Sequence, residues 1–180
     1  MSKYTLMNLT EINHLLLAQL KHIEVAVDMT VGNGYDTLFL IQHFPKVIGF
    51  DIQKQAIEST KEKCSDYTPT LIVDDHFNVD KYLSKADLFV FNLGWLPNSD
   101  KHICTSSYSI TKTLDKCISL LNENGVISII SYQGDESQLR ESIEIENWIS
   151  DNKHLFVQKF SLPNSQNPPI LYLLELKAQP

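Results

Sequence analysis

Short uninterrupted apolar runs recur along the sequence and alternate with segments whose apolar residues follow helical spacing. A run of about four to eight consecutive apolar residues is typical of a strand buried on both faces of a parallel sheet. Parallel neighbours need a crossover connection, usually a helix, so the alternation predicts successive strand and helix units. The predicted strands of this kind are Val25–Asp28, Val47–Asp51, Thr70–Val73, Ala86–Phe91 and Gly125–Ser131.

The segments between these strands carry helical patterns. Thr10 is predicted to cap a first helix, because an apolar stripe at helical spacing follows it. The stripe consists of Ile12, Leu15, Leu16, Leu20 and Ile23. Further helices are predicted at residues 38–42, 53–64, 110–121 and 138–150.

The last two predicted strands, Phe156–Leu162 and Leu171–Leu176, have only a Pro/Asn-rich loop between them and therefore predict an antiparallel hairpin. The predicted fold class is α/β, a doubly wound, mostly parallel, seven-stranded Rossmann-like sheet that ends in this hairpin. At 180 residues, against a prior of roughly 150 per domain, residues 1–180 are expected to form one domain. Ligands of such sheets bind beyond the carboxyl ends of the strands, so functional residues are expected there.

Charge and hydropathy narrow the classes of function. Fifteen Lys and Arg against 22 Asp and Glu give a formal charge of −7, which disfavours a broad nucleic-acid-binding surface. The apolar runs fall far short of the ~18 residues of a membrane span, and the first residues lack a signal-peptide pattern. No membrane partner and a cytoplasmic location are expected. The cysteines form no CxxC pair and the histidines no HxxH or HExxH pattern, so no metal site is predicted.

The segment after the first predicted strand places two glycines between acidic residues. Asp28 ends the strand, Gly32 and Gly34 form the turn, and Asp36 begins the next helix. Glycines let the backbone pass close to a ligand, although a tight strand-to-helix turn without a ligand is the alternative. A dinucleotide-binding fingerprint would have a third glycine where Thr37 stands. The neighbouring carboxylates would also repel a negatively charged pyrophosphate at this helix start. The turn therefore favours a cationic ligand.

Acidic residues also follow the second and third predicted strands. Asp51 lies about 20 residues beyond the glycine turn, the place of an acid that binds ribose hydroxyls, and it could also cap the next helix. Asp74 and Asp75 precede His76, and one of these acidic side chains could accept a hydrogen bond from an adenine amino group, with a plain polar loop as the alternative. These features together favour S-adenosyl-L-methionine (AdoMet), whose amine and sulfonium are positive. NAD is the alternative cofactor.

The fourth predicted strand leads into Asn92, Leu93, Gly94 and Trp95. A side-chain amide and a following backbone carbonyl can both accept hydrogen bonds from a primary amine, and a Trp face can stack on a base. An N-methyltransferase needs this arrangement, because the protein mainly orients a neutral nitrogen toward the methyl group. A turn with a buried Trp is the alternative. The later Asn-Pro-Pro at 167–169 lies in the hairpin loop and is interpreted as a rim element.

Four segments in combination resemble the bacterial putative rRNA methylase family, which includes the MnmM (YtqB)-type tRNA 5-aminomethyl-2-thiouridine methyltransferases. They are DMTVGNGYDTLFL at 28–40, GFDIQ at 49–53, FNLGWLPNSDK at 91–101 and NPP at 167–169. The resemblance covers nearly the whole chain. It implies a class I AdoMet methyltransferase that converts the 5-aminomethyl group of the tRNA wobble uridine, usually 2-thiolated, to the 5-methylaminomethyl form.

The resemblance also implies roles for individual residues. AdoMet contacts would come from Asn33, Asp36, Thr37, Asp51, Gln53 and His76, in addition to Asp28, Gly32, Gly34, Asp75 and Asn92. The residues near the target would be Asn92, Leu93, Gly94, Trp95, Asp100 and Lys101.

The sequence departs from the family pattern at three places, one of which is the Thr-rich segment after Lys101, altered here to Cys104-Thr105-Ser106-Ser107-Tyr108-Ser109. Tyr35 stands where the family usually has His, and Tyr132, Gln133, Gly134 and Asp135 replace a Tyr-His-Gly-His-like stretch. These positions therefore offer no histidine as a proton acceptor. Asp135 or Asp100 is expected to assist deprotonation beside Asn92, and Tyr132 is expected to contact the substrate.

The implied partner is the anticodon arm of a tRNA, which needs only a handful of phosphate contacts. A local basic patch for these contacts is expected from Lys101, His102, Lys112, Lys116, Arg140, Lys153 and His154. A homodimer is an open alternative for the assembly. The alternative functions are rRNA methylation, methylation of a small-molecule amine, and a non-catalytic AdoMet-binding regulatory protein.

Overall fold

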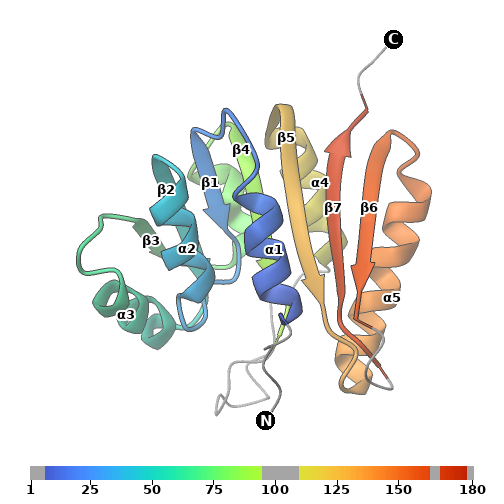
Figure 1. Ribbon diagram of the computed structural model, residues 1–180, viewed down its shortest axis with the longest axis horizontal. Helices are drawn as coiled ribbons and strands as arrows, with labels where there is room; N and C mark the ends of the chain where they lie inside the picture. The colour runs from blue at the N-terminus through green and yellow to red at the C-terminus, as the bar shows by residue number, and fades with distance from the viewer. Residues whose placement is uncertain (1–6, 95–109, 163–166, 178–180) are drawn as a thin grey trace.

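The computed structural model describes residues 7–94, 110–162 and 167–177, which build one seven-stranded sheet (Figure 1). The strand order is β3-β2-β1-β4-β5-β7-β6. Strands β1 to β5 are parallel, and β7 runs antiparallel to both β5 and β6. The predicted fold class and closing hairpin are confirmed. The strands are β1 Val25–Asp28, β2 Lys46–Asp51, β3 Thr70–Val73, β4 Ala86–Asn92, β5 Leu121–Ser131, β6 Leu155–Ser161 and β7 Ile170–Leu176.

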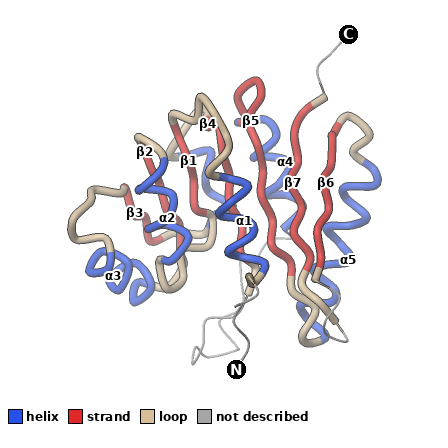
Figure 2. Tube along the Cα trace, in the orientation of Figure 1, coloured by secondary structure: helices blue, strands red, loops and turns tan. Residues whose placement is uncertain are grey.

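Helices cover both faces of the sheet, so that the strands form a single central layer (Figure 2). The α-helices are α1 Leu9–Leu17, α2 Tyr35–His43, α3 Lys54–Lys63, α4 Ile110–Leu120 and α5 Glu136–Asp151. A 3₁₀ helix, η1, spans His76–Lys81. Within the described residues, no helix is both long and apolar enough to cross a bilayer.

Two cores form because successive strand side chains point to opposite faces. Val27 of β1 and Phe89 of β4 pack in one buried cluster with Leu114 of α4. Their neighbours Ala26 and Leu88 pack in a second cluster that contains residues of α1 and α2. All of these strand residues are fully buried, as expected for strands with helices on both sides.

The first helix starts earlier than predicted, and it buries a different face from the one predicted. Its N-cap is Asn8, whose Oδ1 accepts a hydrogen bond from the Glu11 backbone while the Glu11 carboxylate accepts from the Asn8 backbone. This reciprocal capping box satisfies two backbone donors at the helix end. The prediction that Thr10 is the N-cap is therefore wrong. The buried face is Leu9, Asn13 and Leu17, whereas Leu15 of the predicted stripe is 53% exposed.

The third strand is not buried on both faces, as its apolar run had predicted. β3 forms one edge of the sheet, pairs only with β2 among the described strands, and leaves Val73 50% exposed. The short η1 that follows it was not predicted. Asp75 caps η1, because its Oδ1 accepts a hydrogen bond from the Phe77 backbone at 2.8 Å.

The sheet reverses its winding between β1 and β4, which are neighbours although β2 and β3 come between them in sequence. The helices α2, after β1, and α4, before β5, pack on opposite faces of the sheet. A crevice is expected at the carboxyl ends of these two strands, the lower edge of the sheet in Figure 1.

Candidate functional site

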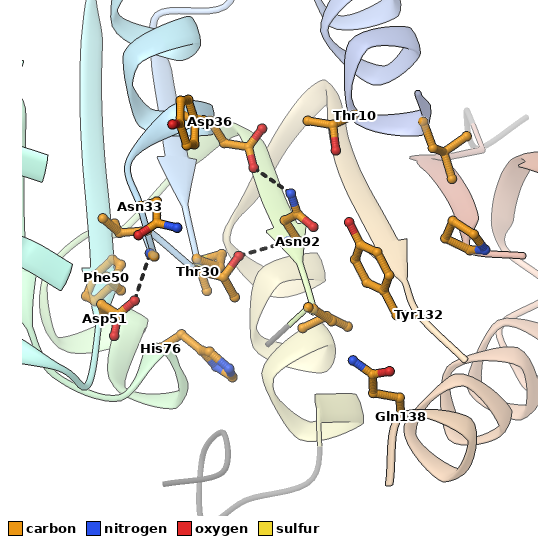
Figure 3. Close-up of a pocket in the computed structure, with 18 of the residues that line it drawn as sticks. Thr10, Thr30, Asn33, Asp36, Phe50, Asp51, His76, Asn92, Tyr132 and Gln138 are labelled. Carbon is orange, nitrogen blue, oxygen red and sulfur yellow. Dashed lines mark hydrogen bonds between the residues drawn. The ribbon is translucent and has the colours of Figure 1, made fainter. Parts of the chain in front are cut away.

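A cavity of about 860 Å³ opens at this edge of the sheet, a size suited to a cofactor and part of a substrate. The close-up in Figure 3 shows two groups of side chains with Asn92, the last residue of β4, between them. Asn33, Asp51 and His76 lie on one side, hereafter the cofactor half. Tyr132 and Gln138 lie on the other, hereafter the acceptor half.

Most of the predicted site residues line this cavity. They are Gly32, Asn33, Asp36, Asp51, Gln53, His76, Asn92, Leu93, Gly94 and Tyr132. Trp95, Asp100 and Lys101 lie outside the described residues. The predicted contacts that do not line the cavity are Asp28, Gly34, Thr37, Asp75 and Asp135.

Asp28 lies beneath the glycine turn, where it is fully buried, and not in the cavity wall. Thr37 Oγ1 donates to Asp28 Oδ2 at 2.6 Å, and the Thr30 backbone donates to Asp28 Oδ1 at 3.1 Å. Burial, and then the negative charge of Asp36, raise the pKa of Asp28 to about 7. Asp28 and Thr37 thus fix the turn from below, and the prediction that they meet the cofactor is corrected.

The raised pKa of Asp28 predicts a loss of stability with rising pH. The folded state binds the Asp28 proton more tightly than the unfolded state, so stability declines between pH 4 and pH 7. An Asp28→Asn variant lacks this titration. Between pH 5 and pH 8 we expect the wild type to lose on the order of 2 kcal/mol more than the variant.

Urea unfolding of both proteins at the two pH values measures this difference. Glu141, whose pKa burial raises to about 7, is present in both proteins and cancels in the comparison. Parallel pH profiles for the two proteins would contradict the assignment.

The glycine turn brings β1 and β2 together through Asp51. Asp51 Oδ2 accepts from the Gly32 backbone at 2.9 Å, and Oδ1 accepts from the Gln53 backbone at 2.8 Å. Burial raises the pKa of Asp51 from its ordinary value. Each carboxylate oxygen retains a second lone pair, and the residue lines the cavity, so Asp51 can still accept from two adjacent hydroxyls.

Two acidic residues follow β3, and they have different surroundings in the structure. Asp74, not Asp75, lines the cavity. Asp74 accepts hydrogen bonds from Asn78 Nδ2 at 2.9 Å and from the Tyr82 hydroxyl at 2.7 Å. The sequence offered two adjacent acids after a strand, and only the start of η1 decides which one caps the helix.

His76 forms a buried part of the cofactor half. Its side chain is 9% exposed, Nδ1 lies 3.3 Å from Thr113 Oγ1, and the ring meets the edge of Phe91. Burial lowers the pKa of His76 and so favours the neutral ring. A neutral imidazole beside an apolar ring offers a wall for a planar heterocycle.

Three residues from three elements form a hydrogen-bonded chain above β4. Asn92 Nδ2 donates to Asp36 Oδ2 at 2.8 Å, and His14 Nε2 lies 2.6 Å from Asp36 Oδ1. The Asn92 backbone N–H donates to Thr30 Oγ1 at 2.8 Å. The Asn92 amide oxygen then points toward Tyr132 and the acceptor half (Figure 3).

The acceptor half lies between α1, the end of β5 and the start of α5. Tyr132 packs over Gly94, where an added Cβ would lie 3.1 Å from the ring, and its hydroxyl bonds with Thr10. Gln138 and Glu141 come from the first turns of α5. Burial, with a contribution from Glu144, raises the pKa of Glu141 to about 7.

Several cavity residues were missed from the sequence, notably Thr10, His14 and Glu141. Thr10 was interpreted as a helix cap, and nothing in the local pattern of α1 or α5 distinguishes His14 or Glu141. Pro169 does line the cavity, as its interpretation as a rim element predicted. Across the described ranges 7–94, 110–162 and 167–177, no group of three His, Cys, Asp or Glu side chains could hold a metal ion.

The fold and the cavity together define a class I methyltransferase, with the cofactor half on β1 to β3 and the acceptor half beyond β4. The model of the family described as "Putative rRNA methylase" matches residues 47–175. The chain belongs to this family.

Two curated proteins illustrate the similarity. The "tRNA (mnm(5)s(2)U34)-methyltransferase, chloroplastic" of Arabidopsis thaliana is 30% identical over 155 residues, covering 76% of this chain and 56% of the relative. The chain therefore spans little more than half the length of that relative. The ribosomal RNA small subunit methyltransferase H of Clostridium botulinum is 36% identical over 73 residues, which are 38% of this chain and 24% of the relative.

Two solved structures are similar over nearly the whole chain. The "putative rRNA-methylase" of Clostridium thermocellum is 34% identical, with a TM-score of 0.86 over 96% of this chain and 100% of that one. SMU.1697c of Streptococcus mutans, described as "a putative methyltransferase" and solved in complex with SAH, is 30% identical, with a TM-score of 0.83 over 96% of this chain and 99% of that one.

Proposed function

We propose that the protein is an AdoMet-dependent N-methyltransferase that converts 5-aminomethyl-(2-thio)uridine at the tRNA wobble position to its 5-methylaminomethyl form. The observation that carries this proposal is the Asn92 amide, which lies between the two halves of the cavity with its oxygen toward the acceptor half. The similarity to the Arabidopsis tRNA methyltransferase supports the choice of substrate.

The cofactor half fits AdoMet. The backbone has positive φ at Gly32, 51°, and at Gly34, 72°, and so forms a turn that leaves room for a ligand beside β1. Asp51 is suited to the ribose hydroxyls, and Phe50 and His76 border the space for the adenine ring. When bound, AdoMet supplies an electrophilic methyl group on a sulfonium.

The chain itself orients the amine that receives the methyl group. Asn92 Oδ1 and the Leu93 carbonyl are the proposed acceptors for its two N–H groups, which leaves the nitrogen lone pair free. The Leu93 backbone is fixed beyond β4, because its N–H donates to the Ile130 carbonyl of β5 at 2.9 Å.

The charges of the cavity wall favour a cationic substrate. Among the described residues, the wall contains no Lys or Arg but several carboxylates. They belong to Glu11, Asp36, Asp51, Asp74 and Glu141. An aminomethyl group is positively charged in water, so these carboxylates attract it into the cavity. It must then lose its proton before it can react.

Glu141 is a better-placed proton acceptor than Asp135. Asp135 caps α5, since its Oδ1 accepts from the Gln138 backbone at 3.0 Å, and it does not line the cavity. Glu141 lines the cavity about one and a half helical turns further along α5. Its pKa of about 7 suits a group that takes up a proton near neutral pH.

The proposed partner remains the anticodon arm. Lys101 and His102 of the predicted basic patch lie outside the described residues, and four of its other members, Lys116, Arg140, Lys153 and His154, do not gather at one place in the described part of the chain. Lys153 and His154 follow the far end of α5, whose first turns border the cavity. Lys116 donates to Asp80 at 2.9 Å, and Arg140 pairs with Glu136. We therefore assign Lys116, Lys153 and His154 no phosphate contact at the site, whereas the exposed Arg140, beside Glu141 on α5, is retained as a candidate.

Nucleoside mass spectrometry tests the proposed function. The purified protein is incubated with AdoMet and total tRNA from cells that lack this gene, and the tRNA is digested to nucleosides. We expect 5-aminomethyl uridines to be converted to 5-methylaminomethyl forms. Methylation of rRNA or of a free amine in its place, or no methylation of any substrate, would overturn the proposal.

The role of Asp51 gives a separate prediction about the cofactor. Asp51→Asn removes one charge-assisted acceptor, so the affinity for AdoMet should fall by about 10- to 100-fold. Isothermal titration calorimetry with AdoMet and with SAH measures this fall. Asp80→Asn, on η1 and outside the cavity wall, is the matched control and should bind as the wild type does. Equal affinities for all three proteins would exclude Asp51 from the cofactor site.

A further inference from the structure

The Asn92 amide can face the acceptor half in two ways that have opposite chemical meaning. With Oδ1 toward the cavity it accepts a hydrogen bond, whereas with Nδ2 toward the cavity it donates one. An amine acceptor requires the first orientation. What fixes the amide therefore decides whether the site can orient an N–H group.

Asp36 fixes the orientation from the other side. A carboxylate has only acceptor oxygens, so the Asn92 atom that faces Asp36 Oδ2 at 2.8 Å must be Nδ2. Asp36 is 7% exposed, and its oxygen Oδ1 lies 2.6 Å from His14 Nε2. Both carboxylate oxygens are thus engaged, and rotation of the Asp36 side chain would cost both contacts.

His14 is itself fixed by the helix that carries Asp36. Its ring stacks on Phe39 with a centroid distance of 4.0 Å and an interplanar angle of 3°. Asp36 and Phe39 are three residues apart on α2 and so lie on the same helical face. The stacked ring therefore presents Nε2 to the carboxylate in one defined direction.

We propose that His14 is a positioning residue which, through Asp36, holds the Asn92 amide oxygen toward the acceptor half and so adapts the site to a substrate that donates N–H groups. The inference deepens the proposed function and rests on it for the identity of the amine. The hydrogen-bonded chain itself is independent of which amine is methylated.

A merely structural role is the rival explanation, in which His14 only joins α1 to α2. Two variants separate the roles. His14→Phe keeps a ring that can stack on Phe39 but has no donor for Asp36. His14→Gln loses the ring but keeps an N–H donor at similar reach. A structural role makes activity follow stability, whereas a positioning role makes it follow the donor.

The first readout needs neither substrate nor cofactor. Hydrogen exchange of the Asn92 side-chain amide is followed by ¹⁵N NMR, with the signal assigned by its absence in Asn92→Asp. We expect exchange about tenfold faster in His14→Phe, because Asp36 is free to turn away, and near wild-type exchange in His14→Gln. Unchanged exchange in His14→Phe would overturn the proposal.

The second readout is the split between kcat and binding. In His14→Phe we expect kcat to fall by about 10- to 100-fold, with SAH affinity within about twofold, and His14→Gln should recover most of the loss. The positioning role of His14 would be overturned if the two variants lost kcat equally, or if the loss of kcat in each variant paralleled the fall in its melting temperature. If no 5-aminomethyl uridine is methylated by any form, the proposed function fails, while the exchange result still decides the role of His14.

Discussion

Replacing Asn92 with alanine is expected to lower the single-turnover rate of tRNA methylation by about a hundredfold or more. The variant loses the oxygen that accepts from the amine, and it also releases Asp36 from the 2.8 Å hydrogen bond that restrains it. The affinity for AdoMet should stay within a few-fold of wild type, because Asp51 and the glycine turn are untouched. Quenched-flow methylation assays and calorimetry measure the two quantities.

Asn92→Asp sharpens the test. It restores an oxygen toward the cavity but places a second carboxylate against Asp36, so we expect it to be nearly as inactive as Asn92→Ala. Asn147→Ala, an exposed position on α5, is the control for a change of the same kind elsewhere. Wild-type turnover in either Asn92 variant would remove Asn92 from the mechanism.

Replacing Gly34 with alanine is expected to destabilise the fold by about 2–4 kcal/mol, from backbone strain and steric overlap together. Gly34 has φ 72°, and a Cβ there would lie 2.4 Å from Thr60 Oγ1 of α3. It begins α2 without any side-chain cap, so a side chain at this position brings no compensating contact. Urea denaturation monitored by circular dichroism measures the change.

A double-mutant cycle with Thr60→Ala isolates most of the steric part of this effect. Removing Thr60 Oγ1 and Cγ2 takes away the two closest contacts and leaves the Thr60 Cβ at 2.9 Å, so Gly34→Ala in that background should cost about 1–2 kcal/mol less. The same cost in both backgrounds would mean that strain alone accounts for the destabilisation.

The strand segments and their mostly parallel pairing could be predicted from the sequence, because strands covered on both faces are largely apolar. β4 illustrates this, with Leu88 and Phe89 buried on opposite faces. The edge position of β3 could not be predicted, since its composition matches that of a central strand. The predicted buried face of the first helix was wrong. Asn8 and Glu11 cap each other at its N-terminus, and the face that is buried consists of Leu9, Asn13 and Leu17.

The residues at or just beyond the ends of strands were predictable in both halves of the cavity, whereas those contributed by helices were not. Asp51 ends β2, Gly32 and Asn33 lie in the turn after β1, and Tyr132 follows β5, so their position in sequence indicates their position in space. His14 and Glu141 reach the cavity from helices, and their contribution depends on how those helices pack. Asp28 was placed in the cavity because it ends a strand, but its side chain points to the buried side of the turn, where it accepts from Thr37.

The position of β7 has a consequence for biosynthesis. β7 lies between β5 and β6 although it follows both in the chain, so β5 emerges from the ribosome before its antiparallel partner exists. Until residues 170–176 are synthesised, one edge of β5 presents unpaired backbone groups of the kind that promote aggregation. Tyr132 directly follows β5, and Pro169 directly precedes β7. A nascent chain can therefore form the cofactor half well before the acceptor half is closed.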